Sequence, residues 1–175
     1  MSHLPPHMQR RAFLKLGIAS AVFLGVAGGA VALIKPGLVD GKITPSTRLI
    51  LTQVGQGMLA GSLPADDAHR HRILSGMMER TDTFIGGLPP HVQAELSQLF
   101  GLLATAPGRR GIVGLSASWE SATAEETVSA LHAMRSSGMD LRVQAYQGLH
   151  DLVCVPYFSG EDSWALLGYP GPIPV

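Results

Sequence analysis

The sequence predicts a single all-α domain of five or six helices, which ends in an irregular tail rich in aromatic residues and proline. Apolar residues recur at spacings of three and four from residue 46 to residue 156, as they do on one face of a helix. Clusters of Gly and Pro separate these stretches, and such clusters end helices and form turns. No stretch of useful length alternates between apolar and polar residues, so the pattern favours helices over strands.

The N-terminal 34 residues have the layout of a secretion signal. Two arginines stand directly before Ala12-Phe13-Leu14-Lys15, and a weakly hydrophobic run without charge follows from Leu16 to Ile34. A paired arginine ahead of Phe-Leu-Lys is typical of twin-arginine signals, which direct the export of proteins that have already folded. An ordinary basic-headed signal or a single membrane anchor is the simpler alternative. The residues that define the predicted export signal are Arg10, Arg11, Phe13, Leu14 and Lys15.

The end of this segment leaves two topologies open. Ala30-Val31-Ala32 has the small-x-small pattern of a cleavage site, with Ala30 and Ala32 as the small residues. The uncharged run is 19 residues long, which is close to the roughly 20 residues that span a bilayer. A cleaved chain would be released into the periplasm, whereas an uncut chain would stay tethered to the outer side of the inner membrane.

Residues 35–45 mix Pro, Gly and single charges, and they are expected to form a linker without a fold, ahead of a helical domain over residues 46–175. The first helix is predicted from Thr47 to Leu59, where apolar residues form one stripe. Gly55 and Gly57 are expected to weaken this helix by about 1 kcal/mol each relative to alanine.

Two further helices are marked by their ends. The second is predicted to start near Pro64, with Ser62 as its N-cap and Asp66-Asp67 in the first turn, where negative charge is favourable. It ends at Gly86-Gly87. The third begins at Pro89-Pro90, since proline suits a first helical turn, and it continues to the following Pro-Gly pair.

The second half of the domain contains one ambiguous segment and two helices. Gly108 to Ser118 could be a strand or a short helix, because its apolar run is too short to decide. Thr123 and Glu126 have the spacing of a capping box and predict a helix that ends at Gly138. The last long helix is predicted from Asp140 to Pro156.

Charge and motifs exclude several classes of function. Without the three basic residues of the signal, the chain has ten basic and thirteen acidic residues, and its only basic cluster is the short pair Arg109-Arg110. Nucleic acid is therefore not an expected partner. The sequence contains no dinucleotide-binding fingerprint and no haem-attachment motif, so the chain is expected to hold no redox cofactor itself.

His150, Asp151 and Cys154 are the group best suited to chemistry. His150 and Cys154 are four residues apart and share a helix face, where they could bind a metal or lower the pKa of the thiol. No third or fourth ligand is nearby, so no metal site is predicted. Cys154 is the only cysteine and cannot form a bridge within the chain. It is either a buried, inert thiol or half of a disulfide to another chain.

The tail, residues 157–175, concentrates aromatic side chains. Tyr157, Phe158, Trp164 and Tyr169 fall within thirteen residues, and prolines stiffen the segment that follows. Aromatic residues on a stiffened segment lose little entropy on binding and bury a large area, so the tail could dock on a partner. It could equally wrap back onto its own helices, and both arrangements can hold at once.

The twin-arginine head and this tail together resemble the gluconate 2-dehydrogenase subunit 3 family, the small (gamma) subunits of flavin-dependent dehydrogenases. The local match is Tyr157-Phe158-Ser159, Trp164, and Gly168-Tyr169-Pro170-Gly171-Pro172, whereas the helical middle is similar only in size and character. The residues assigned to partner binding are Tyr157, Phe158, Trp164, Gly168, Tyr169, Pro170, Gly171 and Pro172.

The resemblance implies a subunit without chemistry of its own. Such subunits bind a large glucose-methanol-choline-type oxidoreductase that holds FAD and oxidises a sugar or an alcohol, and they escort it through the twin-arginine translocase. Electrons then pass to a cytochrome c subunit or another acceptor. The contrasting hypothesis is a free-standing exported helical protein, either a ligand-binding module or a small enzyme that uses His150, Asp151 and Cys154.

Overall fold

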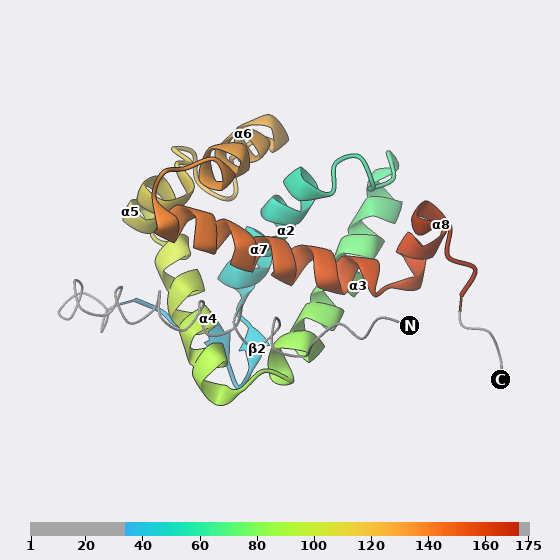
Figure 1. Ribbon diagram of the computed structural model, residues 1–175, viewed down its shortest axis with the longest axis horizontal. Coiled ribbons are helices and arrows are strands. Elements are labelled where there is room, and N and C mark those ends of the chain that lie inside the picture. The colour runs from blue at the N-terminus through green and yellow to red at the C-terminus, as the bar shows by residue number, and fades with distance from the viewer. Residues whose placement is uncertain (1–33, 172–175) are drawn as a thin grey trace, which may run out of the picture.

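The computed structural model describes residues 34–171, and in this part of the chain nearly all regular structure is helical, which confirms the predicted all-α class. Seven α-helices occur there, of which α5 and α8 are single turns. In Figure 1, α7 crosses the front of the molecule with α2 behind it, while α8 lies at the opposite end from α4, α5 and α6. The predicted signal residues Arg10–Lys15, the cleavage residues Ala30 and Ala32, and Pro172 lie outside the described residues.

The elements follow one another along the chain with short connections. The bounds are β1 (Leu38–Val39), β2 (Lys42–Ile43), α2 (Pro45–Met58), α3 (Asp67–Gly86), α4 (Pro90–Ala104), α5 (Ala106–Gly108), the π-helical turn η2 (Arg109–Val113), α6 (Ala124–Arg135), α7 (Asp140–Phe158), the 3-10 turn η3 (Glu161–Ser163) and α8 (Trp164–Leu167).

Helix α2 is the centre of the core, because it packs against α3, α4, α6 and α7. Its buried side chains include Ile50, Leu51 and Val54. The glycines expected only to weaken this helix lie where its neighbours come closest. A methyl group at Gly55 would lie 3.1 Å from Met77 Cε, and one at Gly57 would lie 3.3 Å from a methyl carbon of the α6 residue Thr127. The glycines therefore let α3 and α6 pack close to α2.

Helix α3 begins later than predicted because its N-cap is Asp66, not Ser62. Asp66 Oδ1 accepts a hydrogen bond from the His69 backbone N–H at 2.7 Å, and the carboxylate lies at the positive end of the helix. The backbone carbonyl of Ser62 instead accepts a hydrogen bond from the hydroxyl of Tyr157 at 2.7 Å. The start of α3 is thus tied to the end of α7.

Residues 35–45 are not an unstructured linker, so that prediction is wrong. They contain an antiparallel hairpin in which Leu38 lies opposite Ile43, and both side chains are buried. Asp40 and Gly41 form the turn with φ angles of 51° and 73°, and Asp-Gly suits the positive φ that a two-residue hairpin turn requires. Two residues per strand are too few for any periodicity to be recognised in the sequence.

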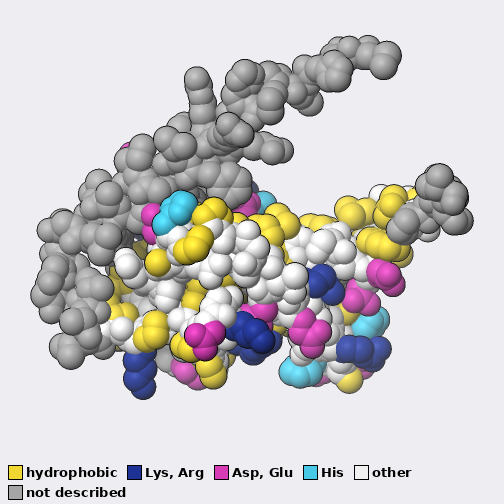
Figure 2. Space-filling model, turned by 90° about the horizontal axis from the view of Figure 1, so that it is seen from below, with side chains coloured by type: hydrophobic (Ala, Val, Ile, Leu, Met, Phe, Trp, Pro, Cys, Tyr) yellow, Lys and Arg dark blue, Asp and Glu magenta, His cyan; other side chains and the backbone are white. Residues whose placement is uncertain are grey.

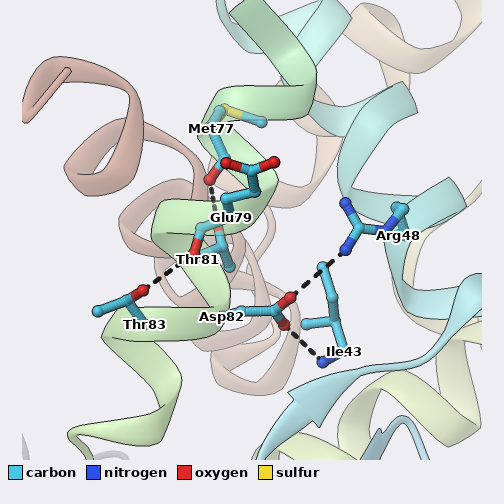
Figure 3. Close-up of polar contacts among 7 residues, drawn as sticks. All are labelled: Ile43, Arg48, Met77, Glu79, Thr81, Asp82 and Thr83. Carbon is cyan, nitrogen blue, oxygen red and sulfur yellow. Dashed lines mark hydrogen bonds and ion pairs between the residues drawn. The ribbon is translucent and has the colours of Figure 1, made fainter. Parts of the chain in front are cut away.

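Asp82 of α3 attaches this hairpin to the helical body (Figure 3). Its Oδ1 accepts a hydrogen bond from the Ile43 backbone N–H at 2.8 Å, and its Oδ2 lies 3.4 Å from Arg48 Nη2 of α2. One carboxylate therefore joins the hairpin, α2 and α3.

The ambiguous segment Gly108–Ser118 contains no strand. The segment starts in a helical turn and continues as η2. This helical structure ends at Gly114, which adopts the left-handed conformation at φ 82°. The capping box that follows is confirmed: the Glu126 backbone N–H donates to Thr123 Oγ1 at 3.1 Å, and the Thr123 N–H donates to Glu126 Oε2 at 2.9 Å.

Candidate functional site

Tyr157, the first aromatic residue of the tail, belongs to the core. Its side chain is only 1% exposed, and its ring meets that of Phe158 edge to face at 4.9 Å between centroids. Burial, and secondarily the charge of Asp162, raise the pKa of the Tyr157 phenol. Tyr157 therefore closes the domain on itself, and it offers no free surface to a partner.

Exposed large apolar side chains are concentrated in the residues that flank and follow Tyr157. Of the seven large hydrophobic side chains that are exposed within residues 34–171, five lie between Val155 and Tyr169. We call these five residues the C-terminal apolar surface. Its members and their exposed fractions are Val155 (47%), Phe158 (37%), Leu166 (57%), Leu167 (56%) and Tyr169 (48%).

The tail turns back over Trp164 after α8. Gly168 ends α8 in the left-handed conformation at φ 65°, and the Tyr169 backbone N–H donates to the Trp164 carbonyl at 2.9 Å. The rings of Trp164 and Tyr169 then meet edge to face at 5.3 Å. Gly171, at φ 98°, is buried against the same indole, since a methyl group there would lie 3.2 Å from it.

The two glycines of the Gly-Tyr-Pro-Gly motif thus have a conformational role, because both occupy positive φ. Trp164 is half-buried beneath this turn, whereas Tyr169 and Pro170 remain exposed. Part of the tail therefore folds back on the domain while Tyr169 and Pro170 face outward, so both arrangements considered for the tail occur within residues 164–171.

Sequence reasoning missed three members of the C-terminal apolar surface, namely Val155, Leu166 and Leu167. Val155 follows the buried pair Leu152 and Val153, but its side chain is exposed on the outer side of α7. Leu166 and Leu167 lie in the four-residue helix α8, which contacts η3 and extends away from the larger helices (Figure 1). Such a short helix gives no periodic signal.

The group His150, Asp151 and Cys154 lies on one side of α7, next to Val155 and Phe158 in the helical repeat. His150 Nδ1 lies 3.2 Å from Asp151 Oδ1, and the ring of Tyr146 lies 6.1 Å from that of His150. Burial, followed by the charge of Asp151, raises the pKa of the Cys154 thiol. A catalytic cysteine needs a lowered pKa, so this arrangement does not favour a catalytic thiol.

Residues 34–171 contain no cluster of three or more His, Cys, Asp or Glu side chains placed to hold a metal ion. None of the helices within the same range is sufficiently long and apolar to cross a membrane.

The geometry therefore defines an all-α domain whose surface feature is an apolar end built from α7, η3 and α8. No protein-family model, curated protein or solved structure matches this chain.

Proposed function

We propose that this chain is a non-catalytic small subunit that binds and stabilises a large FAD-dependent dehydrogenase of the glucose-methanol-choline type, and escorts it to the periplasm through the twin-arginine translocase. FAD would belong to the large subunit, which would oxidise a sugar or an alcohol and pass electrons to a cytochrome c subunit or another acceptor. The observation that carries the proposal is the concentration of exposed apolar side chains between Val155 and Tyr169.

An exposed apolar patch on a soluble domain commonly marks an interaction site. Here the patch lies in the same tail that carries the resemblance to dehydrogenase small subunits, and Phe158 and Tyr169 belong to both. The paired arginines of the signal add a second support, because the twin-arginine route transports folded proteins and can export a complex already loaded with its cofactor.

The decisive experiment is a pull-down of the tagged chain from cells that express it with its own operon. A yellow complex with a flavin absorption spectrum and one large second subunit is the expected result. Recovery of a colourless single chain would contradict the proposal and would favour a free-standing exported protein.

We further propose that Cys154 can form a disulfide with the large subunit. The thiol is free and half-buried, and it lies one helical turn from the exposed Phe158 on α7. Non-reducing electrophoresis of the purified complex should then show a heterodimer band that a reductant removes. A Cys154→Ser variant that gives the same band would exclude this bridge.

A further inference from the structure

We infer that the C-terminal apolar surface docks on a protein surface that is apolar at its centre and carries Lys or Arg side chains at its edge. This inference rests on the proposed function and specifies the chemistry of the large subunit at the contact. Apolar burial would supply affinity, and the charges at the edge would supply orientation and association rate.

The charged residues that this stretch of the chain itself contributes are acidic. The chain contains no Lys or Arg after Arg142, whereas Asp151, Glu161 and Asp162 occur in this stretch and are exposed. Asp151 precedes Val155 by one helical turn on α7, so the two share a face. Glu161 and Asp162 form η3, which connects the Phe158 end of α7 to Leu166 and Leu167. Figure 2 shows hydrophobic and acidic side chains close together at one end of this face, with a basic side chain nearby.

Arg80 of α3 also contacts this end of the molecule. Arg80 Nε donates to the Pro156 carbonyl at 2.6 Å, and Nη2 is buried without a hydrogen-bond partner. Its guanidinium lies against Gly160 so closely that a methyl group there would be 2.4 Å from Nη2. Arg80 therefore binds the backbone at this end and supplies one positive charge, which the three exposed carboxylates outnumber.

This charge pattern distinguishes three possible binding partners of the apolar surface: a membrane, a second copy of the chain and another protein. Anionic lipid headgroups attract basic segments and repel acidic ones, so an acidic edge is unsuited to a membrane surface. A second copy of the chain would place the same carboxylates opposite one another in a two-fold contact, which is also repulsive. A protein surface with an apolar centre and a basic edge satisfies both parts of the pattern.

The test measures association of the full chain with the large flavoprotein subunit, expressed separately, as a function of NaCl concentration. The first variant combines Asp151→Asn, Glu161→Gln and Asp162→Asn. A matched control combines Asp40→Asn, Glu95→Gln and Glu125→Gln, which changes the net charge equally but lies on the hairpin turn, α4 and α6. A third variant, Leu166→Ser with Leu167→Ser, removes apolar area at two side chains that are more than half exposed, so the fold should persist.

We expect the first variant to associate about tenfold more slowly than wild type at low salt, and the difference to disappear in about 0.5 M NaCl, where screening is strong. The control should change the association rate by less than about twofold, because its charges are remote from the contact. The Leu166/Leu167 variant should dissociate at least about tenfold faster, since exposed apolar contacts act mainly on the dissociation rate.

Each contrary outcome has a distinct meaning. If wild-type chain captures no flavoprotein, the proposed function fails and this inference fails with it. If wild type binds but the acidic variant matches it at every salt concentration, the proposed function stands and the basic edge is excluded. Unchanged binding by the leucine variant excludes the apolar surface. Binding to vesicles of three parts phosphatidylcholine and one part phosphatidylglycerol, or a dimer that the leucine variant abolishes, would assign the surface to lipid or to a second copy.

Discussion

Pro156 lies inside α7 and cannot donate the backbone hydrogen bond that Leu152 would normally accept. The hydroxyl of Thr81 on α3 compensates, because it is fully buried and lies 3.4 Å from the Leu152 carbonyl, in addition to its 2.9 Å bond to Met77. A proline that would weaken α7 alone is thus tolerated through a side chain on the neighbouring helix.

Thr81→Val should therefore lower the free energy of unfolding by about 1 kcal/mol, since it keeps the side-chain shape but removes the donor. In a Pro156→Ala background, the new N–H can bond to Leu152, and the loss caused by Thr81→Val should be smaller by about 0.5 kcal/mol or more. Urea denaturation of the four proteins measures this coupling. Equal losses in both backgrounds would show that Thr81 acts only within α3.

The thiol of Cys154 should titrate at higher pH than a free cysteine, because burial and then Asp151 raise its pKa. Only the thiolate reacts with iodoacetamide, so the rise of the rate with pH should be displaced upward. Asp151→Asn removes the smaller of the two causes and should move the curve part of the way down, with faster alkylation at pH 8. Asp140→Asn, at the start of the same helix, is the control. Fast alkylation of wild type at pH 7 would instead favour a catalytic thiol.

At the level of elements, the hairpin depends on a single carboxylate for its polar attachment to α3. Asp82→Ala removes the carboxylate that accepts the hydrogen bond of the Ile43 backbone N–H and that pairs with Arg48 (Figure 3). We expect a loss of about 1 to 3 kcal/mol in the free energy of unfolding, most of it from the unsatisfied N–H. Glu79→Ala, one turn earlier on α3 with an exposed side chain, should change it by less than about 0.5 kcal/mol. Similar losses in both variants would mean that Asp82 has no special role.

The contrast between hairpin and helices shows what a sequence can reveal. Each long helix has enough turns for its apolar stripe to appear, and Thr123 with Glu126 marks a helix start through side-chain chemistry that is purely local. The hairpin has only two residues per strand. Ile43 and Asp82, which join it to α3, are 39 positions apart in the chain. Such a contact joins segments that are distant in the chain, so no local pattern encodes it.

The C-terminal apolar surface, like the fold, could be predicted from the sequence only in part. The density of aromatic residues identified the tail, and Phe158 and Tyr169 are indeed exposed. Composition alone could not show that Tyr157 is buried and Phe158 exposed, because this depends on the direction in which each side chain points. The Tyr157 hydroxyl points inward and bonds to Ser62, which is 95 residues earlier in the sequence. The exposure of Val155, Leu166 and Leu167 likewise follows from how α7 ends and where α8 extends, both of which are tertiary properties.

For the whole molecule, the proposed export signal and the apolar surface fit one model, in which the chain folds and binds its proposed partner before it crosses the membrane. The twin-arginine pair should then be indispensable, because the unfolded-chain route could not carry a flavin-loaded complex. We expect Arg10→Lys with Arg11→Lys to retain both this chain and the large subunit in the cytoplasm, as measured by immunoblots of periplasmic and cytoplasmic fractions.

Arg72→Lys with Arg135→Lys is the control for that experiment, since it makes the same substitutions at two exposed arginines outside the signal. Export of both subunits should continue in this control. If the signal variant is exported normally, the chain crosses unfolded by the general route and cannot escort a folded partner. The C-terminal apolar surface would then bind its partner only after export. Retention of the large subunit in the signal variant therefore supports escort before translocation, whereas its normal export supports assembly in the periplasm.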